Sequence, residues 1–307
     1  MAHSTSAAEE RRARNLNSTG SEPYDFITSR ENRWLKTFRA ALQGKGPQSG
    51  EPMGVEGPKM VEDALRAGME AEALLVSESG ERDAERVLRA ARESHGGIRV
   101  GRILQTTDRL FQSVTDTKTP QGVAALIRQR EWGIEEVLRG PGAMRESAPL
   151  VAVLVAVQDP GNVGTIVRSA EAFGATGVVA TRGTADPWSP KALRASAGSA
   201  LRLPVLRAMA IPILIAQLKI AGVKLYAAAS AQAKAGGRLG SSLEADWSGP
   251  VALFIGNEGG GLLPEVTHAV DRMISIPTTG HVESLNAGIA ASILLYEAAR
   301  ERRLNSR

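Results

Sequence analysis

The chain has 307 residues, of which 43 % are hydrophobic and 23 % charged, a balance typical of a globular protein with two domains. It contains no cysteine, which excludes disulfides, thiolate zinc sites and cysteine nucleophiles. Its four histidines are not paired at the spacing of metal ligands, so we expect no bound metal. The net charge of +4 arises from residue 151 onward, where 15 basic residues outnumber 11 acidic ones, and it permits an anionic partner without requiring one.

The beginning of the chain is polar. Residues 1–23 are rich in charged and small side chains, which predicts a disordered tail. This tail lacks the apolar core of a secretory signal, and no apolar run in the chain reaches the 18 or so residues that span a membrane. We therefore expect a cytoplasmic protein that is not bound to a membrane.

Residues 24–138 alternate between helix and strand patterns and predict a small α/β domain. No catalytic arrangement of side chains is evident in it. A stretch rich in glycine and proline at residues 139–149 predicts a linker to the next domain. The expected helices are Asn32–Leu42, Pro58–Gly68 and Glu81–Ala91, and the expected strands are Ala73–Val76, Ile98–Leu104 and Gly122–Ile127.

Residues 150–307 predict a second, more regular domain. Val151–Val157 is uniformly apolar and rich in β-branched residues, as in a strand buried on both faces of a parallel sheet. A helix with Ile166, Ala170 and Phe173 on one stripe follows and ends at Gly174. The alternation of strands and helices predicts an open parallel α/β sheet. The other expected strands are Val178–Ala180, Leu225–Ala229, Val251–Ile255 and Met273–Ile276, and the other expected helices are Ile211–Ala221 and Leu285–Arg302.

Three loops follow strands of this sheet, where α/β proteins bind their ligands. The first loop, Gln158–Gly164, leads into the helix that carries Arg168. We expect Asn162 to cap this helix, and Gly164 to allow a close approach to the backbone. A plain strand–turn–helix connection with a surface arginine explains this segment about equally well.

The second loop, Gly256–Pro264, contains four glycines in six residues and an acid, Glu258. The chain has neither the dinucleotide-binding glycine pattern nor a P-loop, so those two phosphate-binding sites are excluded. The third loop, Ile274–Asn286, leads into a helix that begins with small residues. We expect Ser284 or Asn286 to open that helix, and its small side chains to admit another backbone or a flat ligand.

Taken together, the three loops resemble the motifs of the SpoU (TrmH-like) family of RNA 2′-O-ribose methyltransferases, in the SPOUT superfamily. The first family motif has the form N-x-G-x-x-x-R-x-A and corresponds here to Asn162–Ala170. The second has a G-N-E-G core, found at Gly256–Gly259, and the third an I-P…E-S-L-N pattern, found from Ile276 to Asn286. The resemblance covers the whole second domain.

The first domain resembles the substrate-binding domain that accompanies this family, an RNA-binding module similar to a ribosomal protein fold. The matching segments are Val55–Glu62 and Asp116–Gly122. The chain departs from the family at Gly260, where members often have an acid, and at Ala287 and Gly288, where members often have larger or hydroxylated residues.

The resemblance implies a C-terminal trefoil knot in the parallel sheet and a homodimer with its active site near the subunit interface. It implies S-adenosylmethionine as the cofactor, with contacts from Gly256, Ile276 and Leu285. It also implies RNA as the substrate, because only RNA carries the 2′-hydroxyl that accepts the methyl group.

The resemblance further assigns the chemistry to Asn162, Arg168, Glu258, Ser284 and Asn286. The family proposal makes Arg168 the proton acceptor, but a guanidinium stays protonated with a pKa above about 12. Gripping the phosphate beside the target ribose is an equally good role for it. Glu258 then holds Arg168 or acts as the base, and the remaining three residues orient the hydroxyl or the arginine.

The layout of two domains resembles that of enzymes that modify ribosomal RNA, which implies ribosomal RNA, and 23S RNA in particular, as the substrate. Transfer RNA is the alternative within the same class of enzyme. An RNA-binding protein without catalysis is the alternative from another class, and the intact motif residues argue against it. A small-molecule methyltransferase is less favoured, because it leaves the first domain without a use.

Overall fold

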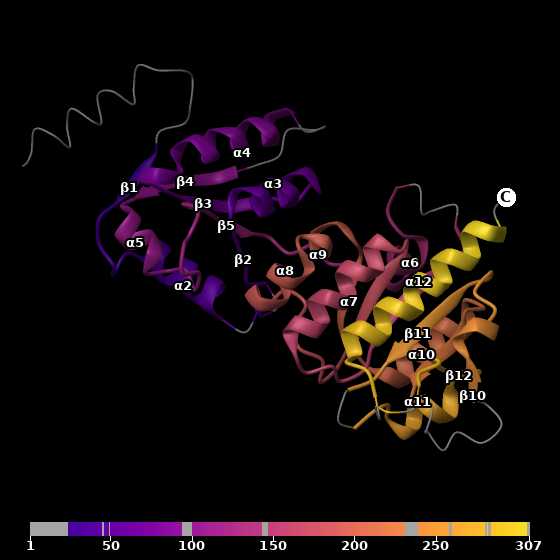
Figure 1. Ribbon diagram of the computed structural model, residues 1–307. Helices are drawn as coiled ribbons and strands as arrows, with labels where there is room; N and C mark the ends of the chain where they lie inside the picture. Colours follow the sequence, from indigo (N-terminus) through magenta and orange to yellow (C-terminus); the bar gives the residue numbers. More distant parts are fainter. Residues whose placement is uncertain are drawn as a thin grey trace, which may run out of the picture. The chain divides into compact units, whose positions relative to one another are not determined.

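The computed structural model describes residues 24–305, except 45, 49, 94–99, 143–146, 231–238, 258–259, 280 and 282–283. The tail expected at residues 1–23 therefore lies outside the described residues. The chain divides into two compact units (Figure 1). One contains residues 54–128 and those before residue 44, and the other contains residues 44–53 and those from 129 onward. No helix among the described residues is long and apolar enough to cross a membrane.

The first unit is built on a mixed five-stranded sheet in the order β1-β4-β3-β5-β2. Strand β3 lies in its centre, parallel to β4 and antiparallel to β5. The strands are β1 (Asp25–Ile27), β2 (Met53–Glu56), β3 (Ala71–Ser77), β4 (Val100–Thr106) and β5 (Val123–Ile127). The helices are α2 (Arg33–Gln43), α3 (Pro58–Arg66), α4 (Glu81–Glu93) and α5 (Asp108–Gln112).

Helices cover both faces of this sheet. Phe38 of α2 and Phe111 of α5 pack with Leu75 and Leu126 of the sheet in one buried cluster. Helices α3 and α4 pack against each other and against β3 and β5. The expected small α/β fold is confirmed, and the three helices predicted here are α2, α3 and α4. The short elements β1, β2 and α5 were not predicted, because three to five residues are too few to show a period.

The second unit contains a seven-stranded sheet in the order β10-β12-β9-β11-β6-β7-β8. Its strands pair in parallel throughout the described registers, which confirms the predicted parallel sheet. The strands are β6 (Leu150–Leu154), β7 (Gly177–Thr181), β8 (Val205–Met209), β9 (Lys224–Ala229), β10 (Leu239–Ser241), β11 (Val251–Ile255) and β12 (Arg272–Ser275).

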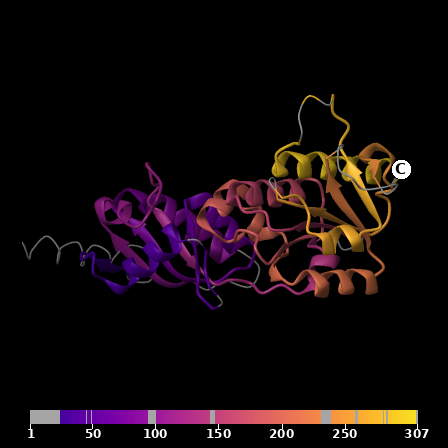
Figure 2. The same ribbon diagram turned by 90° about the horizontal axis from the view of Figure 1, so that it is seen from below.

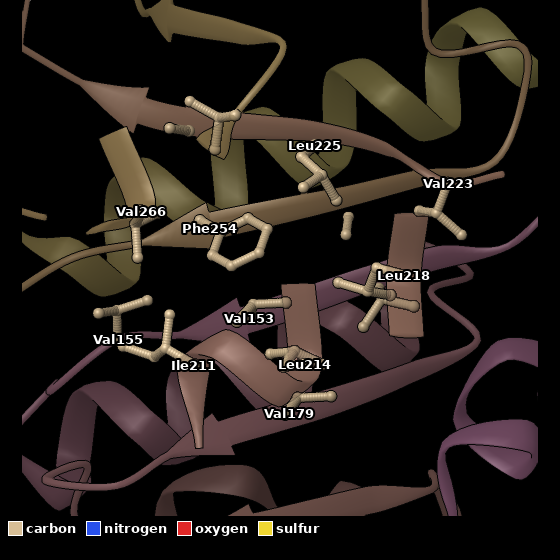
Figure 3. Close-up of a cluster of buried hydrophobic side chains, with 14 of the residues drawn as sticks. Val153, Val155, Val179, Ile211, Leu214, Leu218, Val223, Leu225, Phe254 and Val266 are labelled. Carbon is tan, nitrogen blue, oxygen red and sulfur yellow. The ribbon is translucent and has the colours of Figure 1, made fainter. Parts of the chain in front are cut away.

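Two layers of helices enclose this sheet, and Figure 2 shows α12 and α10 on its opposite sides. On the α10 side, Leu214 and Leu218 pack against Val153 and Phe254 of the sheet (Figure 3). On the other side, α7 contacts the sheet, α8 and α12. The helices are α6 (Ile134–Arg139), α7 (Pro160–Ala172), α8 (Pro190–Ser196), α9 (Ser199–Arg202), α10 (Ile211–Ile220), α11 (Pro264–Ala269) and α12 (Ala287–Asn305).

The last turns of α12 are fastened to the beginnings of two central strands by Arg302. Its guanidinium donates to the carbonyl oxygens of Ala148 and Pro149, directly before β6, at 2.5 and 2.9 Å. It also donates to those of Trp247 and Gly249, shortly before β11, at 2.8 and 2.6 Å. Burial lowers the pKa of Arg302 from its ordinary value. One planar side chain thus ties a helix to two strands of the sheet.

Among the predicted boundaries that differ from the structure, two have a clear physical cause. The strand expected at Val151–Val157 ends at Leu154, because Ala156 takes a left-handed backbone conformation with φ of 53°, which breaks the extended chain. The sequence also extended the first domain to residue 138, whereas α6 belongs to the second unit. Val137 of α6 is buried in the same cluster as Val151 and Val179.

Candidate active site

The three loops singled out in the sequence start at one edge of the parallel sheet. Strand β6 pairs with β11, β11 with β9, and β9 with β12. Because these strands are parallel, their carboxyl ends share an edge, and ligands of such sheets bind there. The segments after Leu154, Ile255 and Ser275 therefore begin on the same side of the unit.

Helix α7 begins at Pro160 and is capped by Asp159, so the expected cap at Asn162 is wrong. The Asp159 carboxylate accepts a hydrogen bond from the Gly161 amide at 3.1 Å, and Pro160 occupies the first helical position, which it favours. Lys191 of α8 donates to the same carboxylate oxygen at 2.7 Å. The Lys191 ammonium, followed by the Gly161 amide, holds the pKa of Asp159 below its usual value.

Asn162 instead lies inside the first turn of α7, where it is 9 % exposed. Its Oδ1 accepts a hydrogen bond from Nδ2 of Asn286 at 3.1 Å. The Oδ1 of Asn286 accepts from the backbone amide of Ile289 at 3.2 Å, which confirms the expected cap at the start of α12. The cap therefore fixes the orientation of the Asn286 amide and turns its Nδ2 toward Asn162.

Arg168 lies on α7, one turn beyond Gly164, and its side chain is exposed. Gly164 does allow a close approach, but the neighbour is helix α8. A Cβ on Gly164 would lie 2.5 Å from Cβ of Ala195 and 2.9 Å from the amide nitrogen of Ser196. Gly164 is thus required by the packing of α7 on α8, and Arg168 is left facing solvent.

The second loop closes on itself directly after β11. Asn257 and Gly261 exchange two backbone hydrogen bonds, of 3.1 and 2.9 Å. A Cβ on Gly256 would lie 2.5 Å from the carbonyl oxygen of Gly261, so this closure requires glycine at that position. Glu258 lies outside the described residues.

The third loop contains two aliphatic side chains that are not fully exposed. Ile276 and Leu285 are half-buried, and Ser284 is exposed. Gly288 lies against α7, because a Cβ there would sit 3.2 Å from Cγ2 of Thr165 and 3.3 Å from Oδ1 of Asn162. The small start of α12 therefore serves helix packing.

The residues at these loops fit S-adenosylmethionine. Backbone amides and carbonyls near Gly256 supply the donors and acceptors that an uncharged adenine needs. The half-buried aliphatic side chains of Ile276 and Leu285 supply apolar contact. No cluster of histidine and acidic side chains suited to a metal ion occurs among the described residues.

Sequence reasoning missed the partners that hold α7 in place. The Asp159–Pro160 pair carried a signal for the start of the helix, since aspartate at the cap followed by proline is typical of helix starts. Ser169 and Ser292 carried no signal. Their hydroxyls lie 2.6 Å apart although the residues are 123 positions apart in sequence.

Comparison with known proteins identifies both units. Residues 149–296 match the SpoU rRNA methylase family, and residues 35–125 match the MRM3-like substrate-binding domain. The 23S rRNA (guanosine(2553)-2′-O)-methyltransferase RlmP of Bacillus subtilis is 32 % identical over 88 % of this chain and 97 % of its own length.

Solved structures agree with this assignment. The AdoMet-bound rRNA methyltransferase from Sinorhizobium meliloti is 31 % identical, with a TM-score of 0.75 over 91 % of this chain and 98 % of its own. The SpoU methyltransferase AviRb from Streptomyces viridochromogenes, in complex with AdoMet, is 25 % identical, with a TM-score of 0.74 over 89 % of this chain and all of its own. The chain therefore belongs to the SpoU rRNA methylase family and is an RNA methyltransferase that uses S-adenosylmethionine.

Proposed function

We propose that this protein methylates the ribose 2′-hydroxyl of a nucleotide in 23S ribosomal RNA. The observation that carries the proposal is the Asn162–Asn286 hydrogen bond of 3.1 Å, which joins the first and third loops beside the helix of Arg168. The likeness to RlmP over nearly its entire length supports this reaction and this class of RNA.

The bound cofactor supplies a methyl group that is already activated by the sulfonium, so the protein must mainly position the 2′-oxygen and help to remove its proton. We assign the adenosine contacts to Gly256, Ile276 and Leu285. Both the closed second loop and the half-buried aliphatic side chains of the third loop support this assignment.

In this proposal, the guanidinium of Arg168 binds the phosphate next to the target ribose. This guanidinium is exposed, and its planar set of N–H donors suits the oxygens of a phosphate. Glu258 is the proposed base or partner of Arg168. Asn162, Ser284 and Asn286 orient the hydroxyl.

Replacing Arg168 tests the site directly. Arg168→Ala should lower the rate of methyl transfer by at least about 100-fold, because a misplaced ribose loses its alignment with the donor. Binding of S-adenosylmethionine, measured by calorimetry, should change less than twofold. Arg168→Lys keeps the charge and should recover part of the rate. A normal transfer rate in Arg168→Ala would refute the assignment.

The substrate is tested by mapping 2′-O-methyl groups in total RNA with and without the gene. We expect one site in 23S RNA to lose its methyl group and to regain it when the wild-type gene returns. A loss confined to transfer RNA would exclude ribosomal RNA. The same mapping in a strain that carries Arg168→Ala tests whether the protein catalyses the reaction or only binds RNA. If the protein only binds RNA, every methyl group should stay in place in this strain.

We propose that the first unit selects the RNA and that the second unit, which includes α6, carries out the reaction. The match to a substrate-binding domain supports the first role. Exposed Arg33 and Lys36 on α2 offer positive charge for phosphates. An RNA substrate of this kind would place the enzyme in the cytoplasm.

We also propose that the C-terminal segment forms a trefoil knot. Strand β12 lies between β9 and β10, yet the helix that follows it packs against α7, the helix that follows β6. The chain from β12 to α12 must therefore cross the edge where the second loop lies. A crystal structure tests whether this crossing is a knot. The backbone is traced, its two ends are joined by a path outside the molecule, and the closed curve is examined for a knot.

We also propose that the protein is a homodimer whose interface is formed by α12. Ile289, Tyr296 and Leu304 of this helix are 53, 49 and 59 % exposed, an unusual apolar stripe for a surface helix. A hollow of about 230 Å³ adjoins the stripe and is lined by Phe173, Tyr296, Ala299, Arg300, Arg303 and Leu304. A second copy of the chain would cover both.

Charge placed on this stripe should split the dimer. We expect Ile289→Asp to sediment as a monomer at concentrations where the wild type sediments as a dimer, because two buried carboxylates would lack partners. Ile220→Asp is the matched control, since Ile220 is 87 % exposed on α10, on the opposite side of the sheet. A wild-type monomer at micromolar concentration would rule the dimer out.

A further inference from the structure

Helices α7 and α12 lie side by side and contact each other at regular steps from their N-terminal ends (Figure 1). The first step is the Asn162–Asn286 hydrogen bond. The next two are the approach of Gly288 to Thr165 and the Ser169–Ser292 pair. The last step is an edge-to-face contact of Phe173 with Tyr296, whose ring centroids are 5.7 Å apart. Both helices therefore run in the same direction along one seam.

The serine pair in the middle of this seam has a defined direction. Ser292 Oγ donates its hydrogen to the carbonyl oxygen of Gly288 at 2.6 Å. A hydroxyl has only one hydrogen, so the 2.6 Å contact between the two serines requires Ser169 Oγ to donate to Ser292 Oγ. Both side chains are half-buried, where a hydrogen bond competes less with water. The result is a directional chain from α7 through Ser292 to the backbone of α12.

Around this pair, the α12 side of the seam is made of small residues. Ala287, Gly288 and Ala291 are buried there. Their side chains are too small to interdigitate with those of a neighbouring helix and so to fix its position. A polar pair within such a contact specifies register, since sliding would break the hydrogen bond between the two half-buried hydroxyls. Ser169 directly follows Arg168, so the register that it fixes is also that of the proposed phosphate-binding arginine.

We infer that Ser169 and Ser292 are positioning residues for methyl transfer. Their hydrogen bond sets the register of α7 against α12, and that register places Asn162 against Asn286 and determines where Arg168 lies along the seam. The inference rests on the proposed function of these three residues. The two serines do not touch substrate or cofactor in this scheme and act only through the helices that carry the site.

Serine-to-alanine changes test this without opening a large cavity. We expect Ser169→Ala and Ser292→Ala each to lower kcat about tenfold, since a shift of about 1 Å costs up to 100-fold in rate. KM for RNA and the Kd of S-adenosylmethionine should change less than twofold. The assay follows transfer of a labelled methyl group from S-adenosylmethionine to total RNA from a strain that lacks the gene.

The double variant and a conservative one sharpen the test. Both alanine changes remove the same hydrogen bond, so the double variant should be about as slow as either single variant. Ser292→Thr should restore most of kcat, because a helical threonine can still bond the carbonyl four residues before it. Additive losses, or no recovery in Ser292→Thr, would contradict the inference.

Thr176→Val is a control that lowers the stability of the fold without changing the register of α7 against α12. Thr176 is fully buried and its hydroxyl bonds the backbone of Leu150 at 3.2 and 3.1 Å, at the opposite end of β6 from the site. This variant should lose thermal stability but keep its kcat. If the serine variants lose no more kcat than Thr176→Val, the serines are only structural and the inference fails.

Arg168→Ala distinguishes failure of the inference from failure of the proposed function. Wild-type kcat in both serine variants, beside an inactive Arg168→Ala, would overturn the register inference and leave the site standing. An active Arg168→Ala would overturn both, because the serines would then have no arginine to position.

Discussion

Asp159 shows how a single side chain serves the helix that carries the site. Its carboxylate caps α7 through Gly161 and binds Lys191 of α8, so one group fixes both the start of the helix and its neighbour. The pair is partly exposed, with side chains 48 and 63 % accessible, and pairs of this kind contribute about 1 kcal/mol or less. The Asp159–Lys191 pair therefore acts mainly by fixing the position of the helix start and contributes little to the free energy of unfolding.

The lowered pKa of Asp159 gives a pH dependence with a definite sign. Above its ordinary pKa of 3.8 the ionised carboxylate stabilises the fold, and this stabilisation is lost as the pH falls through the lower pKa of the folded state. Asn caps helices about as well as Asp but lacks the charge. At pH 7, Asp159→Asn should therefore melt about 1–3 °C below the wild type.

This gap between Asp159→Asn and the wild type should begin to close once the pH falls below about 4, and it should vanish below the lowered pKa of folded Asp159, where both side chains are neutral. Thermal melts followed by circular dichroism from pH 3 to pH 7 measure it. Asp159→Ala loses the cap as well and should stay less stable than Asp159→Asn at every pH. A gap that does not vary with pH would show that the charge on Asp159 does not stabilise the fold.

At the scale of elements, the contact between α7 and α8 depends on Gly164. Adding a methyl group there forces the two helices apart, and overpacking of this kind costs about 1–3 kcal/mol. Gly164→Ala should therefore melt several degrees below the wild type. It should also slow methyl transfer, since α7 carries Asn162 and Arg168. Gly249→Ala adds the same methyl group where no atom lies within 4 Å and should leave both properties unchanged.

The sequence predicted long buried elements well and short ones poorly. Val251–Ile255 is β11 with the bounds that its apolar run indicated. Strand β10 has three residues, and α8 and α9 are short and rich in alanine and serine, so none of them shows a period. The cap of α7 was misplaced by three residues because asparagine is also a favoured capping residue, whereas the Asp159–Pro160 pair determined where the helix begins.

At the scale of the whole molecule, the sequence predicted two α/β units and a site at one edge of a parallel sheet. Strand direction alone brings the three loops to that edge, so their convergence follows from topology. The Asn162–Asn286 and Ser169–Ser292 contacts depend instead on how α7 packs on α12. Such packing joins segments more than 120 positions apart, and no local pattern encodes it.

The hydrogen bonds from Arg302 to the backbone before β6 and β11 have a consequence for how the chain folds during its synthesis. Every strand of the sheet precedes α12 in the chain, so a ribosome makes the strands before the residue that fastens them. Until α12 emerges, the face of the sheet that it covers stays open to water, and exposed apolar surface of this kind binds chaperones. Nascent chains stalled before residue 287 should therefore bind chaperones, and the chain with α12 free of the ribosome should be released from them.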